Sequence, residues 1–258
     1  MIKLENTEVM GWEHAIRGMR NPMNSWAKSD SMRCEDRATC DHCFFEGNIY
    51  GDRATYSVSC DEALGEAPKF SIGPNDHELM MKLAAGGAVH AKYRRMITVY
   101  LDITAPLYWW KEFDTYKVGT VANSCSTMHK IHEKEFTLND FSCEHLMTKC
   151  DLGALFIPVK VDESIIYSPM GVLECFIVPM LNKCRDRYLE TKDKKYWWQM
   201  IQLLPSSYNQ KRTIMLNYEV LVGVYKHRKN HKLDEWREFC QWIEKLPYSE
   251  IITGGNEE

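Results

Sequence analysis

A strict alternation of apolar and polar positions near the middle of the chain constrains the fold more than any other feature. The apolar positions are Ile97, Val99, Leu101 and Ile103, and Thr, Tyr and Asp side chains separate them. Because successive side chains of a strand point to opposite faces, residues 96–104 are predicted to form a strand with one buried face. The following Ala-Pro pair should end it, since proline has no N–H for a ladder hydrogen bond.

Apolar residues spaced three and four apart predict helices on both sides of this strand. A short strand within residues 1–10 is expected before the first helix, and Pro179 should kink a later one. This order predicts an α+β fold, with a mixed or antiparallel sheet flanked by helices and a helical C-terminal half. We interpret residues 1–258 as a single domain with a cysteine-bearing insertion at about 30–73. The predicted helices cover about residues 12–19, 75–85, 107–117, 171–188, 194–204, 213–229 and 236–243.

Charge and hydropathy exclude several classes of function. The net charge of -4 and pI of about 6.2 provide no overall attraction for nucleic acid or acidic membranes. No window approaches the ~18 apolar residues that a membrane span needs. The charged N-terminal residues do not resemble a signal peptide, so we expect a cytoplasmic protein. Its cysteines should then be reduced, with Cys175, Cys184 and Cys240 on hydrophobic helix faces as small buried residues.

Four cysteines near the N-terminus allow two interpretations. Cys40 and Cys43 form a C-x2-C pair that could bind zinc together with Cys34 and Cys60, or all four could be free thiols in a loop. A second paired motif is missing, and the histidines at 129 and 132 are better explained as a solvated or hydrogen-bonded pair. The sequence also lacks G-x-S-x-G, H-E-x-x-H, Walker A and G-x-G-x-x-G, which removes support for the common hydrolases, zincins and phosphate loops.

Residues 105–129 are the best candidate for a ligand site. Charged side chains, among them Lys111, Glu112 and Lys117, lie among bulky aromatics directly after the predicted strand. The polar run at 120–129 is rich in the hydroxyls and amides that orient ligands. The alternative is an amphipathic helix with packed aromatics and solvated charges.

This segment resembles the flavin-dependent thymidylate synthases. In that family a strand leads through Ala-Pro into a helix bearing Arg-His-Arg, and a Ser-x-Asn-Glu-x-Ser-x-Arg-Tyr loop follows. Here the triplet is Thr115-Tyr116-Lys117, the preceding Arg-Gln is Lys111-Glu112, and the loop serine is Cys125.

The resemblance extends over most of residues 75–245 in the same order. Residues 76–93 resemble the family's helix and Gly-His-x-x-Pro-Phe-Glu-His turn, with Arg95 at the final histidine. Leu204-Pro205 and Asn217 resemble its Leu-Pro and Asn-Ala-Arg elements. Arg228 falls at its substrate-binding arginine, although a cation that stabilises a helix C-terminus is an equal explanation. Asp234-Glu235-Trp236 lies near its Gln-Trp-Glu element.

The resemblance implies an enzyme that methylates dUMP to dTMP with methylenetetrahydrofolate, FAD and NADPH. It also implies a homotetramer with FAD between subunits and no required cysteine nucleophile. Two alternatives stay open: a non-catalytic nucleotide- or flavin-binding protein on the same scaffold, and an interaction module with a zinc-binding insertion. The implied substrate-binding residues are Lys111, Glu112, Ser124, Ser126 and Arg228, and the cofactor-binding residues are Arg95, Tyr116, Lys117 and Asn217.

Overall fold

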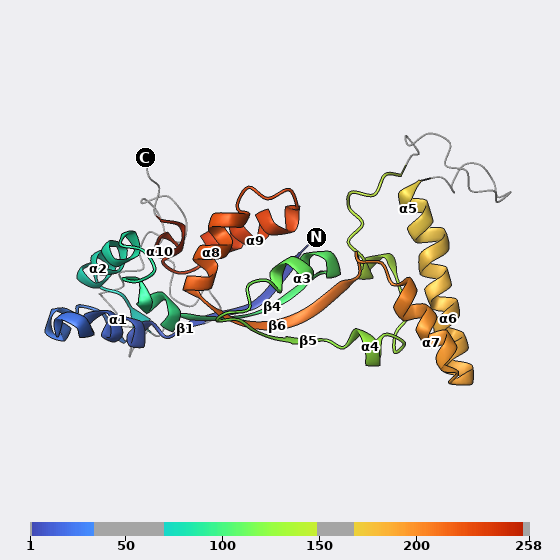
Figure 1. The fold of residues 1–258 in the computed structure, drawn as a ribbon, viewed down its shortest axis with the longest axis horizontal. Helices are drawn as coiled ribbons and strands as arrows, with labels where there is room; N and C mark the ends of the chain where they lie inside the picture. The colour runs from blue at the N-terminus through green and yellow to red at the C-terminus, as the bar shows by residue number, and fades with distance from the viewer. Residues whose placement is uncertain (1, 34–69, 149–167, 255–258) are drawn as a thin grey trace, which may run out of the picture. The chain divides into compact units, whose positions relative to one another are not determined.

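The computed structural model describes residues 2–33, 70–148 and 168–254 (Figure 1). The cysteines of the proposed zinc site lie outside these residues. Among the described residues, no helix has the length and apolar character needed to cross a membrane. The strands are β1 (Lys3–Met10), β2 (Met32–Arg33), β3 (Phe70–Ser71), β4 (Thr98–Pro106), β5 (Val121–Ser124) and β6 (Asn209–Asn217). The α-helices are α1 (Trp12–Arg20), α2 (Pro74–Ala85), α3 (Leu107–Phe113), α4 (Thr127–Lys130), α5 (Pro169–Val172), α6 (Val178–Thr191), α7 (Lys194–Leu203), α8 (Tyr218–Arg228), α9 (Asp234–Glu244) and α10 (Glu250–Thr253). Short 3-10 turns are η1 (Asn21–Met23), η2 (Trp26–Lys28), η3 (Lys92–Met96) and η4 (Leu138–Asp140), and η5 (Leu173–Ile177) is a π-helical turn.

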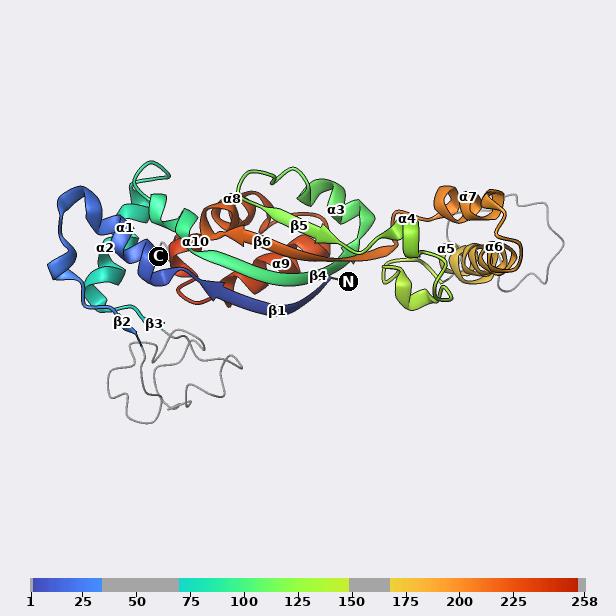
Figure 2. The ribbon, with the colours of Figure 1, turned by 90° about the horizontal axis from the view of Figure 1, so that it is seen from below.

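Four strands form an antiparallel sheet in the order β1-β4-β6-β5 (Figure 2). The strand predicted at 96–104 is confirmed as β4, in which Val99, Leu101 and Ile103 are buried, but it runs from Thr98 to Pro106 and so includes the Ala-Pro pair that was expected to follow it. A second, two-stranded sheet pairs β2 with β3, with Met32 opposite Ser71. The predicted α+β class with an antiparallel sheet is therefore confirmed.

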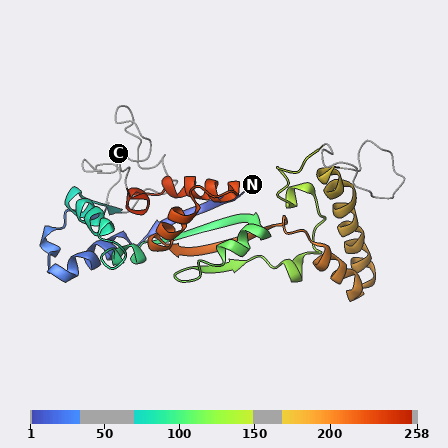
Figure 3. The same cartoon turned by 45° about the horizontal axis from the view of Figure 1, so that its top comes forward.

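The chain divides into two compact units. The first unit comprises Met1–Leu4, Asp102–Thr115 and Asn123–Thr213. Its helices α6 and α7 pack side by side as a hairpin (Figure 3). The core beneath them consists of Ile131, Phe136, Phe141, Leu173, Val178, Leu181, Cys184 and Met200.

The second unit comprises Glu5–Leu101, Tyr116–Ala122 and Ile214–Glu258. Helices α8, α9 and α10 contact one another, and α1 and α8 both contact η3. Trp12 packs edge-on against Tyr218, with ring centroids 5.4 Å apart. Arg20 and Asp76 form a buried ion pair that joins α1 to α2.

Three local predictions were wrong or too long. Residues 213–217 belong to β6 rather than to a helix, because Ile214 and Leu216 alternate with more exposed neighbours. The predicted helix 107–117 ends at Phe113. Cys175 is exposed, whereas Cys184 and Cys240 are buried as predicted.

The predicted helix at 171–188 is interrupted just before Pro179. A proline cannot donate a hydrogen bond to the carbonyl four residues earlier, and the preceding turn η5 adopts π geometry. Phe176 and Met180, which the four-residue spacing of an α-helix would put on one face, are 38% and 53% exposed. A π turn breaks α-helical periodicity, and Phe176 lies within it and Met180 shortly after it.

Candidate functional site

Helix α3 carries two of the predicted substrate residues, Lys111 and Glu112, on its more exposed side. Trp109, Trp110 and Phe113 are buried, and the rings of Trp109 and Phe113 stack with centroids 5.0 Å apart. The interpretation of α3 as an amphipathic helix with packed aromatics therefore describes its buried side. Lys111 is exposed and Glu112 is half-buried, so their charges lie where a ligand could reach them.

The first turn of α3 is attached to the segment that leads into β6. The backbone N–H groups of Leu107 and Tyr108 donate to the carbonyl oxygens of Tyr208 and Ser206, each over 3.0 Å. The indole N–H of Trp110 donates to the Gln210 carbonyl over 3.0 Å. The start of a helix leaves backbone donors without intrahelical acceptors, and this segment satisfies two of them.

Arg212 on β6 links α3 to the same strand, and the sequence analysis did not identify it. Its Nη1 donates to Oδ1 of Asp114 over 2.7 Å, and its Nε donates to Oε1 of Gln210 over 3.0 Å. The guanidinium carbon lies 4.1 Å from the centroid of the Trp110 ring. This is the geometry of a cation–π contact, with the two hydrogen bonds in the guanidinium plane fixing its orientation.

Two more of the predicted substrate residues lie at the end of β5 and in the segment that follows it: Ser124 is the last residue of β5, Ser126 comes two residues later, and both are exposed. Ser126 is the N-cap of α4, where its Oγ accepts a hydrogen bond from the His129 N–H over 3.0 Å. Between the two serines, the Cys125 N–H donates to the Lys211 carbonyl over 2.9 Å. A second bond of 2.9 Å runs from Nε2 of Gln210 to the Cys125 carbonyl, so both polar groups of the Cys125 backbone are bonded to residues of β6.

In the second unit, Tyr116 and Arg228 are brought together although they are 112 residues apart. Arg228 is the last residue of α8, and its Nε donates to the Tyr116 hydroxyl over 3.0 Å. Its guanidinium lies 4.7 Å from the Trp236 ring centroid. Both explanations of Arg228 therefore have a structural basis, since it is a helix C-terminal cation and also part of an aromatic cluster.

The buried thiol near this cluster is unsuited to nucleophilic chemistry. Burial, aided by Glu244, raises the pKa of Cys240 to about 12, although Arg228 acts in the opposite direction. A thiol with that pKa carries almost no thiolate at neutral pH. We therefore assign Cys240 to packing.

Asn217 has a clear local role at the start of α8. Its side-chain oxygen accepts a hydrogen bond from the Val220 N–H over 3.1 Å, as an N-cap does. Gly119 has a φ of +80°, and a Cβ there would lie 2.9 Å from Nδ2 of Asn217. The turn that carries exposed Lys117 therefore approaches the start of α8 closely, and it requires glycine.

Arg95 lies exposed on η3, whereas its neighbour Arg94 is buried. Arg94 donates to Glu219 over 2.8 Å and to the Ile251 carbonyl over 3.1 Å. Arg94 is thus committed to the fold, and Arg95 is the cation of the pair that a ligand could reach.

The two histidines do not form a metal site. His129 is exposed, and the His132 ring packs edge-on against Tyr188 with centroids 4.9 Å apart. Within residues 2–33, 70–148 and 168–254, no cluster of three or more His, Cys, Asp or Glu side chains could hold a metal ion.

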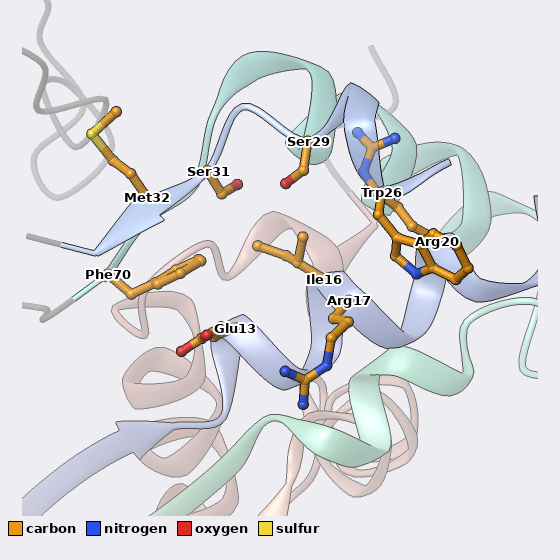
Figure 4. A pocket seen from close by; sticks show the side chains of 9 residues that line it. All are labelled: Glu13, Ile16, Arg17, Arg20, Trp26, Ser29, Ser31, Met32 and Phe70. Atoms are coloured by element: carbon orange, nitrogen blue, oxygen red, sulfur yellow. The ribbon is translucent and has the colours of Figure 1, made fainter. Parts of the chain in front are cut away.

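Each unit also has a pocket lined by other residues. A pocket of about 330 Å³ in the second unit is lined by α1 residues, including Arg17 and Arg20, and by Ser29, Ser31 and Phe70 (Figure 4). A pocket of about 630 Å³ in the first unit is lined by side chains that include Thr104, Phe141, Glu144 and Asn209. The predicted substrate- and cofactor-binding residues line neither of these two pockets.

The chain is similar to known proteins in its structure. No protein-family model and no curated protein sequence matches the chain. A flavin-dependent thymidylate synthase, ThyX, from Helicobacter pylori complexed with FAD and dUMP superposes with a TM-score of 0.57 at 14% identity, covering 98% of both chains. The chain has the ThyX fold. A second structure of the Helicobacter pylori enzyme with FAD and dUMP gives 0.57 at 13% identity, covering 99% of this chain and 98% of that one.

The ThyX fold also occurs in a UMP/dUMP methylase, PolB, from Streptomyces cacaoi, solved with 5-Br dUMP. It superposes with a TM-score of 0.51 at 11% identity and covers 98% of this chain and 93% of that one. The predicted resemblance is thereby confirmed at the level of the fold, over nearly the whole chain.

Proposed function

We propose that this protein binds FAD and a pyrimidine nucleotide and methylates the nucleotide, in the manner of a flavin-dependent thymidylate synthase. The observation that carries the proposal is the ThyX fold over 98% of the chain, shared with an enzyme complexed with FAD and dUMP and with a UMP/dUMP methylase. We take dUMP as the substrate and methylenetetrahydrofolate as the methylene donor. A cytoplasmic homotetramer that uses NADPH completes the proposal.

For the nucleotide, we propose Lys111, Glu112, Ser124, Ser126 and Arg228. A nucleotide phosphate is a dianion, and cations and hydroxyl donors bind it best when an arginine supplies a planar fork. Lys111 and the two serines are exposed on the first unit, and half-buried Arg228 belongs to the second. Their donor types match a phosphate and sugar.

For FAD, we propose Arg95, Tyr116, Lys117 and Asn217. The residues suit the cofactor's charge, because Arg95 and Lys117 are exposed cations that could bind its pyrophosphate. Bound FAD would supply the redox chemistry that reduces a transferred methylene to methyl. Lysine cannot form the bidentate contacts of arginine, so Lys117 should give weaker FAD affinity than an arginine would.

One observation favours the non-catalytic alternative. The Nε of Arg228 already donates to Tyr116, and its guanidinium packs on Trp236, so part of its hydrogen-bonding capacity is used within the protein. A scaffold that binds a nucleotide without turnover would tolerate this arrangement. The zinc-module alternative rests on cysteines outside the described residues.

The proposal is tested by binding and turnover on the purified full chain. We expect FAD to bind, dUMP to bind the FAD-loaded protein, and dTMP to form from methylenetetrahydrofolate with reduced flavin. Binding of both ligands without dTMP, and without methylation of UMP, would support the non-catalytic alternative. Failure to bind either ligand would overturn the proposal.

A further inference from the structure

We propose that Arg212 and Gln210 are positioning residues that hold the Ser124–Ser126 loop and helix α3 at a fixed separation for the nucleotide. This inference rests on the proposed function, since it assigns those two elements to the nucleotide. Neither β6 residue is proposed to touch the ligand. All the residues involved belong to the first unit.

The first half of the link runs from α3 to β6. Arg212 is tied to the C-terminal end of α3 by the 2.7 Å bond to Asp114, and the Trp110 ring lies under its guanidinium. The Arg212 side chain is 14% exposed but the Asp114 carboxylate is 48% exposed, so the ion pair alone is weak and the Trp110 ring and Gln210 add to the hold on the guanidinium. Lys111 and Glu112 lie between Trp110 and Asp114, the residue that caps the C-terminus of α3. Arg212 therefore contacts residues before and after the two proposed substrate residues of α3.

The second half runs from β6 to the loop. Gln210 is 8% exposed, accepts the Arg212 Nε–H through its side-chain oxygen, and donates through its side-chain nitrogen to the Cys125 carbonyl. Because arginine can only donate, it fixes which end of the Gln210 amide faces it, and the N–H end must then face the loop. Arg212 thus sets the orientation of the group that holds Cys125.

The consequence is a continuous chain of hydrogen bonds from Asp114 through Arg212 and Gln210 to the Cys125 backbone. Ser124 ends β5, which pairs with β6, and Ser126 caps α4, so the bonds of Gln210 and the Lys211 carbonyl to Cys125 fix the one residue that joins these two elements. Such preorganisation strengthens ligand binding without adding a contact, because the loop need not be ordered on binding.

The variants are Arg212→Ala, Arg212→Lys and the milder Gln210→Met, all in the full chain. The matched control is Arg187→Ala, since Arg187 also pairs with a carboxylate at 2.8 Å and lies over a tyrosine ring at 5.7 Å, but on α6. Three quantities are measured for each protein: amide hydrogen exchange at residues 121–130, the Kd of dUMP, and the Kd of FAD.

We expect Arg212→Ala and Gln210→Met to speed exchange in the loop and to weaken dUMP binding by about tenfold, with FAD affinity unchanged. Arg212→Lys should give an exchange rate and a dUMP affinity between those of the wild type and Arg212→Ala, because lysine keeps the charge but cannot make the two planar hydrogen bonds of arginine. Added methylguanidinium should partly restore dUMP binding to Arg212→Ala but not to Gln210→Met, a response that general destabilisation would not give. Arg187→Ala should match the wild type.

Unchanged loop exchange in both Arg212→Ala and Gln210→Met would overturn the anchor itself. Faster exchange with unchanged dUMP affinity would overturn its role in binding. Wild-type protein that binds no dUMP would overturn the proposed function and the nucleotide role of the anchor with it, which distinguishes that failure from the other two. An equal loss of dUMP and FAD affinity would indicate a general structural role and would also overturn the inference.

Discussion

Loss of the buried ion pair between Arg20 and Asp76 should measurably destabilise the second unit. Asp76 is fully buried, and its Oδ1 accepts the Arg20 Nε–H at 2.5 Å. Its Oδ2 accepts hydroxyl bonds of 2.6 Å from Ser29 and Ser31, and backbone bonds of 3.3 and 3.2 Å from Asp30 and Ser31. Asp76→Ala would leave an arginine that is 4% exposed without its counter-charge. Removing one partner of such a pair costs about 3–5 kcal/mol, so we expect a loss of that size.

Urea denaturation of wild type, Asp76→Ala, Arg20→Leu and the double variant measures this loss. The double variant should be less destabilised than the sum of the two single variants, because neither charge is then left unpaired. Asp186→Ala is the control, since Asp186 is 58% exposed in its ion pair with Arg185 and should change stability by less than about 1 kcal/mol. A loss below about 1 kcal/mol for Asp76→Ala, or strict additivity in the double variant, would refute the reasoning.

Three further predictions follow from the same structure. Burial alone would raise the pKa of Asp76, but its hydrogen bonds and ion pair outweigh burial and lower it. The stability that this lowered pKa provides is present above the ordinary value of 3.8 and is lost as pH falls below it. The loss of stability on acidification should therefore be smaller in Asp76→Asn than in the wild type, and an unchanged acid-unfolding curve would contradict the assignment. Arg228→Ala should weaken dUMP binding by about 10–100-fold in calorimetry, and an unchanged Kd would exclude Arg228 from the site. Alkylation followed by peptide mapping should modify exposed Cys125 in the native protein, but Cys184 and Cys240 only after unfolding. Both of these thiols are buried, and burial raises their pKa. Rapid labelling of either one in the native protein would contradict its burial.

The spacing of apolar residues predicted a helix or strand correctly where the residues of that element alone decide its burial pattern. Strand β4 was found from its alternation because one face is buried along its length. Strand β6 was assigned in part to a helix, because Met215, Tyr218 and Val222 are spaced three and four apart across the strand–helix junction. Asn217 marked that junction, since asparagine is a favoured N-cap and begins α8. Asn217 was instead predicted to bind the cofactor, because it resembles part of a family motif.

The site was predicted less completely, because its contacts join distant parts of the chain. Arg212 and Asp114 are 98 residues apart, and no periodicity in the sequence relates them. The bond between Tyr116 and Arg228 was likewise not foreseen, although both residues had been identified separately through family resemblance. Arg94 is buried and Arg95 is exposed, and the sequence alone cannot show which of two adjacent arginines on a 3-10 turn points into the core.

The most direct test of the proposed function is a titration of the purified protein with FAD, followed by dUMP, with the flavin absorption spectrum as the signal. We predict saturable binding of FAD and a further saturable change in the bound flavin's spectrum when dUMP is added, because the proposed reaction requires the flavin and the nucleotide to meet. A spectrum that stays that of free FAD throughout, with no response to dUMP, would contradict the central claim that this fold still binds a flavin and a pyrimidine nucleotide.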